Sequence, residues 1–182
     1  MRSVALGMNV SLDGYVATTD GGLDWAFPNF SPELMAATQA TLDGLDTILM
    51  GRKNYVGQAE SWVGAEGPIA EVMNSVQKVV FSTTLASADW SNSTLASGTP
   101  EEEIARLKDV PGGPIGVSGG ATLAQYVSSH GLVDEYRLTV HPVVLGSGLP
   151  LFTTRIAFDT VDSADFPNGV RVLKLRPRPV SA

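Results

Sequence analysis

The sequence predicts an α/β domain in which a mostly parallel central sheet is flanked by helices and continued by antiparallel strands near the C-terminus. Two observations carry this prediction. Short apolar segments alternate along the first two thirds of the chain with segments of helical periodicity, which is typical of a parallel sheet covered on both faces. In the last third, Tyr136, Leu138 and Val140 alternate with polar residues, as in a strand with two unlike faces.

The predicted strands are short. They cover residues 4–10, 47–50, 78–81 and 115–118, a short strand within 90–96, and then 136–140, 155–161 and 170–176, the last two around a turn region at 165–169. Residues 15–17 form a brief extended piece after a turn. The loops between these elements are expected at residues 18–29 and 57–67, and long loops of this kind often carry function.

Each helical segment begins at a recognisable start signal. Those signals are Ser31–Pro32–Glu33 for a helix that runs to about Asp43, Pro68 for a second helix, the capping box of Thr99 and Glu102 for a third, and the pair Gly119–Gly120 for a fourth. After the glycine pair, Leu123, Tyr126 and Val127 share one helical face. A strand therefore runs directly into a helix through two glycines.

Composition limits the classes of function. A chain of 182 residues with 43% hydrophobic and 17% charged residues fits one globular domain, residues 1–182. The net charge of −7 argues against a broad surface for nucleic acid or for an anionic membrane. With no cysteine, disulfides, thiolate metal sites and cysteine nucleophiles are excluded, and we expect no metal site.

The N-terminus runs directly into a strand-like segment rather than a signal peptide. No apolar stretch is long enough to span a bilayer. We therefore expect a soluble, cytoplasmic protein that does not associate with membranes.

Three strand ends carry distinctive chemistry. These segments are Gly51–Arg52–Lys53 with two cations, Ser82–Thr83–Thr84 with hydroxyls, and Gly119–Gly120–Ala121–Thr122 with the free backbone N–H groups of a helix start. Ligands of parallel α/β sheets bind at the carboxyl ends of the strands, so the three segments together would suit a ligand with several phosphates, such as a dinucleotide. Taken singly, each also has a plain explanation as a tight turn, a solvated pair of cations or turn chemistry.

In order and spacing, several short strings of this chain resemble dihydrofolate reductase and its relatives, including the reductase domain of riboflavin biosynthesis. The strings are Ser11–Leu12–Asp13–Gly14, Ile48–Leu49–Met50–Gly51–Arg52, Val80–Phe81–Ser82, Val117–Ser118–Gly119–Gly120 and Leu132–Val133–Asp134–Glu135. The stretch at 142–152 is more like the riboflavin-type branch. The resemblance covers nearly the whole chain and implies a dihydrofolate reductase-like fold.

The resemblance also implies that NADPH is the cofactor. By it, Gly51, Arg52 and Lys53 lie at a helix start near the cofactor phosphates, and Arg52 or Lys53 pairs with the 2′-phosphate. Ser82 or Thr83 would assist that contact. Gly119, Gly120, Ala121 and Thr122 would hold the pyrophosphate, and the loop from Asp13 onward would border the nicotinamide. Because relatives often form homodimers, a homodimer is expected here.

Three residues are candidates for substrate chemistry. Glu33 lies where the resemblance places a carboxylate that holds the substrate, yet it is also explained as an acid at a helix N-terminus. Asp13 would either orient a substrate amide or hydroxyl or set the turn before Gly14. His141, before Pro142 at a strand end, would either donate a proton or pack in the structure.

The leading hypothesis is an NADPH-dependent reductase. It would transfer a hydride to the C=N or C=O carbon of a small heterocyclic substrate, pterin-like or ribosylaminopyrimidine-like, with Asp13 and Glu33 as the catalytic candidates. One alternative is a stand-alone riboflavin-pathway reductase. The other is a nucleotide-binding protein without catalysis, which would bind NADPH and not turn it over.

Overall fold

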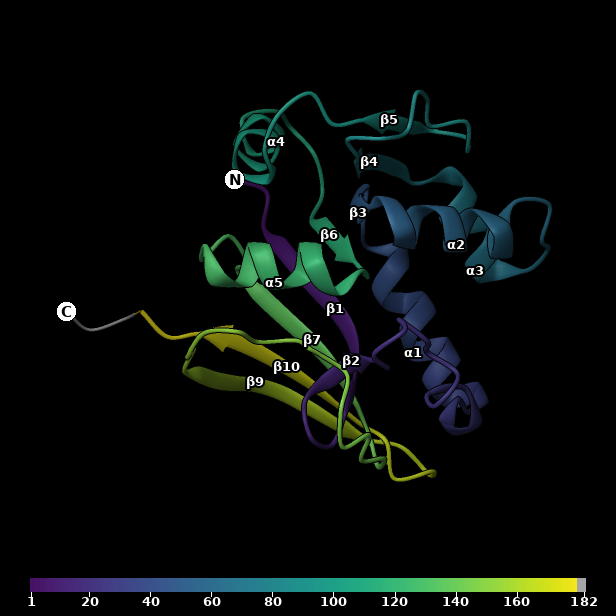
Figure 1. Ribbon diagram of the computed structural model, residues 1–182, viewed down its shortest axis with the longest axis vertical. Helices are drawn as coiled ribbons and strands as arrows, with labels where there is room; N and C mark the ends of the chain where they lie inside the picture. Colours follow the sequence, from purple (N-terminus) through teal and green to yellow (C-terminus); the bar gives the residue numbers. More distant parts are fainter. Residues whose placement is uncertain (180–182) are drawn as a thin grey trace.

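The computed structural model describes residues 1–179 and contains an eight-stranded sheet with helices on both faces (Figure 1). The strands are β1 (Val4–Ser11), β2 (Tyr15–Ala17), β3 (Thr47–Gly51), β4 (Gln77–Phe81), β5 (Ser93–Leu95), β6 (Ile115–Ser118), β7 (Glu135–His141), β8 (Leu149–Pro150), β9 (Phe158–Asp165) and β10 (Arg171–Pro177). The helices are α1 (Pro32–Asp43), α2 (Arg52–Trp62), α3 (Pro68–Ser75), α4 (Pro100–Lys108) and α5 (Ala121–Ser129), with a 3-10 turn at Phe27–Asn29.

The strand order in the sheet is β5-β4-β3-β6-β1-β7-β10-β9. The six strands from β5 to β7 are parallel, whereas β10 is antiparallel to β7 and β9 is antiparallel to β10. Figure 1 shows β4 and β5 at one edge and β9 and β10 at the other. A second, two-stranded sheet pairs β2 with β8. The predicted mostly parallel sheet with antiparallel C-terminal strands is confirmed.

The two faces of the sheet pack on different helices. On one face, Leu6, Val117 and Tyr136 from neighbouring strands pack with residues of α4 and α5 in the larger core. On the other face, Ile48 and Met50 of β3 join a smaller core with residues of α1, α2 and α3. Among the described residues, the smaller core contains none from β1, β7 or β10.

Two sequence predictions are wrong in their details. Residues 57–67 were expected to be a loop, but α2 continues to Trp62. Tyr55, Ala59 and Trp62 face the smaller core at helical spacing, and this burial outweighs the poor helix propensity of Gly57. The strand expected at 155–161 is β9, which begins at Phe158 and ends at Asp165 because its partner β10 begins at Arg171.

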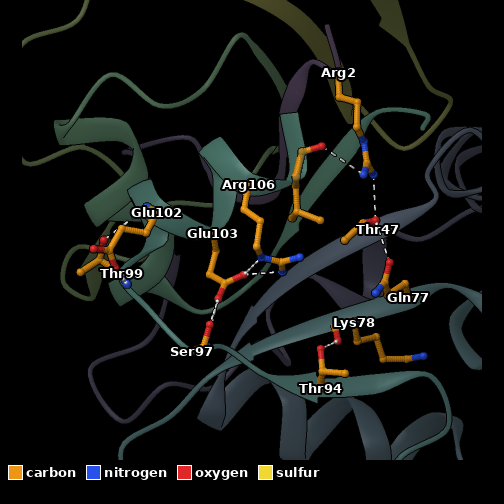
Figure 2. Close-up of polar contacts among 11 residues, drawn as sticks. Arg2, Thr47, Gln77, Lys78, Thr94, Ser97, Thr99, Glu102, Glu103 and Arg106 are labelled. Carbon is orange, nitrogen blue, oxygen red and sulfur yellow. Dashed lines mark hydrogen bonds and ion pairs between the residues drawn. The ribbon is translucent and has the colours of Figure 1, made fainter. Parts of the chain in front are cut away.

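Arg2 stabilises the edge of the sheet at which the parallel strands begin (Figure 2). Its buried guanidinium donates to the hydroxyl of Thr47 at 2.8 Å and to the carbonyl of Gly113 at 2.7 Å, and it forms an ion pair with Asp46. A buried arginine is tolerated only when it is paired in this way.

Among residues 1–179, no helix is long and apolar enough to cross a membrane.

Candidate functional site

The strand order places three predicted segments side by side at the carboxyl edge of the sheet. β4, β3 and β6 are consecutive neighbours, and the parallel register pairs Gly51 with Phe81 and Leu49 with Val117. The segments after these strands therefore begin at the same edge. The convergence of the cationic, hydroxyl and glycine segments is confirmed.

The first turn of α2 combines a free helix N-terminus with two cations. Gly51 is the N-cap in an extended conformation and provides no side chain to accept from the first N–H groups. Arg52 and Lys53 follow, both exposed, and the first turn contains no acid. Cations at the positive end of a helix are unfavourable by a few tenths to about 1 kcal/mol each, whereas an anion there is favourable. This arrangement is therefore suited to an anionic ligand.

A cavity of about 350 Å³ lies between α2 and the segments after β4 and β5, lined by Arg52, Phe81, Ser82, Thr83, Ala96 and Gly98. Lys53 does not line it. The Oγ atom of Ser82 accepts from the backbone N–H groups of Thr84 at 3.1 Å and Leu85 at 2.9 Å. The hydroxyl therefore stabilises the turn, and its own proton stays available to an acceptor in the cavity.

A buried carboxylate that no sequence pattern indicated stabilises the segment of the cavity lining at Ala96 and Gly98. Glu103, 3% exposed, accepts from both the backbone N and the Oγ of Ser97 at 2.9 Å (Figure 2). Its second oxygen accepts from Nε and Nη2 of Arg106 at 3.0 and 2.5 Å. Because Ser97 lies between Ala96 and Gly98, these bonds fix the two lining residues.

The glycine pair after β6 adopts a backbone that other residues rarely adopt. Gly119 and Gly120 have φ values of +62° and +81°, and the latter is the N-cap of α5, where Ala121 and Thr122 form the first turn. A Cβ atom on Gly119 would lie 2.4 Å from Oδ1 of Asn54. The absence of a Cβ atom at Gly119 thus leaves room for the Asn54 side chain, and the N-terminus of α5 has no capping side chain.

Asn54 of α2 is a second residue that the sequence analysis missed. Its Nδ2 donates to the carbonyl of Ser118 at 2.6 Å, directly before the glycine pair. The only signal in the sequence was its place one helical turn after Gly51, and no sequence pattern shows which strand end it contacts.

The two carboxylates predicted for catalysis lie on different segments, Asp13 in the turn after β1 and Glu33 in the first turn of α1. Asp13 accepts from Ser11 Oγ at 2.7 Å and from the N–H groups of Leu145 and Gly146 at 3.1 and 2.8 Å, and these bonds, led by that of Ser11, lower its pKa. Glu33 is exposed in the first turn of α1, where a hydrogen bond from Ser31 lowers its pKa. Both are therefore ionised at neutral pH.

His141, the third candidate, is fully buried at the end of β7. Its Nε2 lies 3.0 Å from Oδ1 of Asn9, and burial lowers its pKa. The imidazole is therefore neutral at pH 7 and holds no acidic proton to donate.

Residues 2–172 match the family described as RibD C-terminal domain. The chain is 36% identical over 177 residues to the uncharacterized protein YyaP of Bacillus subtilis, with 93% of this chain and 92% of that protein covered.

Two solved structures show the same fold. A putative riboflavin biosynthesis protein from Shewanella sp. PV-4 superposes with a TM-score of 0.78 at 24% identity, covering 97% of this chain and 99% of that one. Dihydrofolate reductase from Enterococcus faecalis, complexed with NADP(H), superposes with a TM-score of 0.66 at 13% identity, covering 97% of each chain. The chain has a dihydrofolate reductase-like fold and belongs to the RibD C-terminal domain family.

Proposed function

We propose that this chain is an NADPH-dependent reductase that transfers a hydride to the C=N or C=O carbon of a small heterocyclic substrate of the pterin or ribosylaminopyrimidine class. The observation that carries the proposal is the meeting of two helix N-termini at one sheet edge, one with two cations and the other behind a glycine turn. The family supports a reductase of the riboflavin type. The enterococcal neighbour, whose structure contains NADP(H), supports the choice of cofactor.

The residues at the cavity fit the phosphorylated half of NADPH. Arg52 lines the cavity and makes no ion pair within residues 1–179, so its guanidinium is available for a 2′-phosphate. Ser82 and Thr83 also line the cavity and would add hydroxyl donors. Lys53, outside the cavity lining, would contribute positive charge from the same helix turn.

The glycine turn fits the pyrophosphate. The positive φ of Gly119 and Gly120 lets the chain pass directly from β6 into α5, whose N-terminus has no capping side chain. The N–H groups of Ala121 and Thr122 have no helical carbonyl behind them. Together these groups would hold a diphosphate on uncharged donors, as helix N-termini do elsewhere.

When bound, NADPH would supply the hydride, and the chain would supply binding, orientation and exclusion of water. Asp13 would hold the loop at Leu145 and Gly146 beside the end of β1. Glu33 would supply negative charge at the start of α1. Since the pKa values of both carboxylates are lowered, the proton that completes the reduction would come from water.

We test the cofactor by calorimetry with NADPH and NADH on the native chain and on Arg52→Ala. Arg155→Ala, which removes an exposed arginine outside the site, is the matched control. We expect the native chain and the control to prefer NADPH, and Arg52→Ala to lose about tenfold or more for NADPH alone, the value of a charge-assisted hydrogen bond. Equal losses for both nucleotides, or no binding of either, would overturn the assignment.

Turnover is tested by NADPH oxidation with pterins, ribosylaminopyrimidines and small carbonyl compounds. Oxidation with one of these classes supports the reductase. Binding of NADPH without oxidation by any of them identifies a nucleotide-binding protein without this activity. The expected homodimer is tested separately by light scattering on the purified chain.

A further inference from the structure

The turn between β9 and β10 contains the only asparagine of the chain that is followed by glycine, Asn168, and both residues are exposed. The backbone N–H of Gly169 donates to the carbonyl of Phe166 at 3.0 Å, and the N–H of Phe166 donates to the carbonyl of Val170 at 2.8 Å. Pro167 takes the second position of the turn, and Gly169 has a φ of +77°. The hairpin loop is therefore a β-turn followed by a glycine in the left-handed region.

An asparagine before glycine is prone to lose its amide, because glycine has no Cβ atom beside the attacking nitrogen. After losing its proton, the backbone nitrogen of Gly169 can attack Cγ of Asn168. The new N–Cγ bond closes a succinimide ring, the Cγ–Nδ2 bond breaks, and ammonia leaves. Water then adds to one of the two ring carbonyls, which opens the ring to aspartate or to isoaspartate. The reaction consumes water and involves no oxidation or reduction.

The native turn restrains these two residues only weakly. The attacking N–H of Gly169 is held by one hydrogen bond in an exposed turn. The amide of Asn168 donates from Nδ2 to the carbonyl of Asn29 at 3.4 Å, which is long for a hydrogen bond, and its Oδ1 accepts none from residues 1–179. Exposed turns open locally at a small cost in free energy. The reaction therefore requires opening of the turn and not unfolding of the sheet.

Other asparagines of the chain are held more firmly. Asn54 and Asn74 lie within α2 and α3, and their Nδ2 atoms donate to backbone carbonyls at 2.6 and 2.9 Å. Asn92 is exposed in a turn, but serine follows it, and its Nδ2 donates to two backbone carbonyls at the end of α3, each at 3.1 Å. Asn92 is therefore a matched control within the same chain.

The β9–β10 turn lies beside the segment that precedes α1. The carbonyl of Asn29 accepts from the turn, and the next residue, Phe30, packs on the ring of His141 with centroids 5.7 Å apart. On the glycine of the turn, a Cβ atom would lie 3.5 Å from Cγ of Pro142, directly after His141. The turn therefore contacts both the segment before α1 and the end of β7.

We propose that Asn168 is a site of spontaneous deamidation, and that its conversion to aspartate or isoaspartate removes the hydrogen bond to Asn29. A carboxylate only accepts hydrogen bonds, so it repels the carbonyl to which the amide donated. The isoaspartate product also adds a methylene group to the backbone of the loop. The conversion makes the net charge of −7 more negative by one. No cofactor or substrate takes part, so the proposal does not rest on the reductase function.

The native chain is incubated at mildly alkaline pH and followed by ¹H–¹⁵N NMR and by mass spectrometry of its peptides. We expect the side-chain NH₂ signals of Asn168 to disappear, with aspartate and isoaspartate at this position in the recovered peptide. The NH₂ signals of Asn92 should persist over the same time. The urea-unfolded chain gives the rate without the turn, and we expect it to be faster. Loss of the Asn168 amide in the unfolded chain but not in the native chain overturns the proposal.

Two variants separate the chemistry from its consequence. Asn168→Gln keeps an amide but adds a methylene group before it, which disfavours ring closure, so its side-chain signals should remain; their loss at the native rate overturns the succinimide route. Asn168→Asp reproduces one product and should shift the backbone amide signals of Asn29 and Phe30. Asn92→Asp, with the same change in charge in another exposed turn, should not shift them. Unchanged signals in Asn168→Asp overturn the effect on the segment before α1.

Discussion

Nδ2 of Asn54 donates a hydrogen bond of 2.6 Å to the carbonyl of Ser118, which joins the first turn of α2 to the last residue of β6. Asn54 therefore connects the first turn of α2 to the residue directly before the glycine turn of α5, the two helix N-termini proposed to bind the cofactor. The free backbone N–H groups at a helix N-terminus point along the helix axis. The relative placement of the two helices therefore decides whether both can bind one ligand.

Replacing Asn54 by Ala should weaken NADPH binding severalfold and lower the free energy of unfolding by about 1 kcal/mol, the net value of one hydrogen bond. Calorimetry and urea denaturation measure the two effects. Glu60→Ala, an exposed change on the same helix, is the control and should leave both unchanged. If Asn54→Ala bound NADPH with native affinity, the hydrogen bond from Asn54 to Ser118 would not contribute to the site.

Alanine at Gly119 should cost more stability than alanine at Gly120. Both have positive φ, which costs a residue with a Cβ atom about 1–2 kcal/mol. At Gly119 the new Cβ would also lie 2.4 Å from Asn54, whereas at Gly120 the nearest atom is 3.6 Å away. In contrast, Gly57→Ala within α2 meets open space and should stabilise by about 0.5–1 kcal/mol. Urea denaturation of the three variants gives the order, and the reverse order for Gly119 and Gly120 would contradict the turn geometry.

Glu103→Gln should make the free energy of unfolding less dependent on pH under acidic conditions. Burial raises the pKa of Glu103, but the hydrogen bonds from Arg106 and Ser97 outweigh it, so the folded-state pKa lies below 4.5. A lowered pKa contributes stability above pH 4.5, which is lost as the pH falls through the folded-state value. We expect Glu103→Gln to be less stable at pH 7 by about 1–3 kcal/mol and to show a shallower loss below pH 4.5. Parallel acid-dependent slopes for the two proteins would exclude this role.

Because of Lys78, the free energy of unfolding should increase as the pH rises from 8 to 10.5. The side chain is fully buried, donates to the carbonyls of Val76 and Ser91 at 2.7 and 2.8 Å, and lies 4.5 Å from the ring centroid of Trp90. Burial lowers the pKa of Lys78 to about 8 from 10.5. Between these values the unfolded chain binds the extra proton, so stability rises with pH, by at most about 3 kcal/mol.

Lys78→Met removes this titration and should abolish the rise, which chemical denaturation at pH 7 and pH 10 measures directly. Lys53→Met, which removes an exposed lysine, is the control and should keep the rise. The same rise in Lys78→Met as in the native chain would assign it to other groups.

Local sequence signals identified most of the elements. The capping box of Thr99 and Glu102 and the cap at Ser31 are formed as predicted, because each is closed within three residues of the chain. For α2, only a helix start at residues 51–53 was expected and residues 57–67 were predicted to be a loop, because the residues that stabilise this helix face a core made by other segments. The residue pattern of α2 alone does not show which other segments form the core that it packs against.

The sequence by itself determined most of the strands, that a glycine pair precedes α5, and that cations follow β3, but not β8 or the bounds of β9. Only the tertiary structure decided that β4, β3 and β6 are neighbours, which brings those segments to one edge. It also joined Asn9 to His141, 132 residues apart, and Asn54 to Ser118. The physical reason is one of range. Caps and turns depend on bonds within a few residues, whereas strand order and side-chain pairing depend on how the whole chain buries its apolar faces.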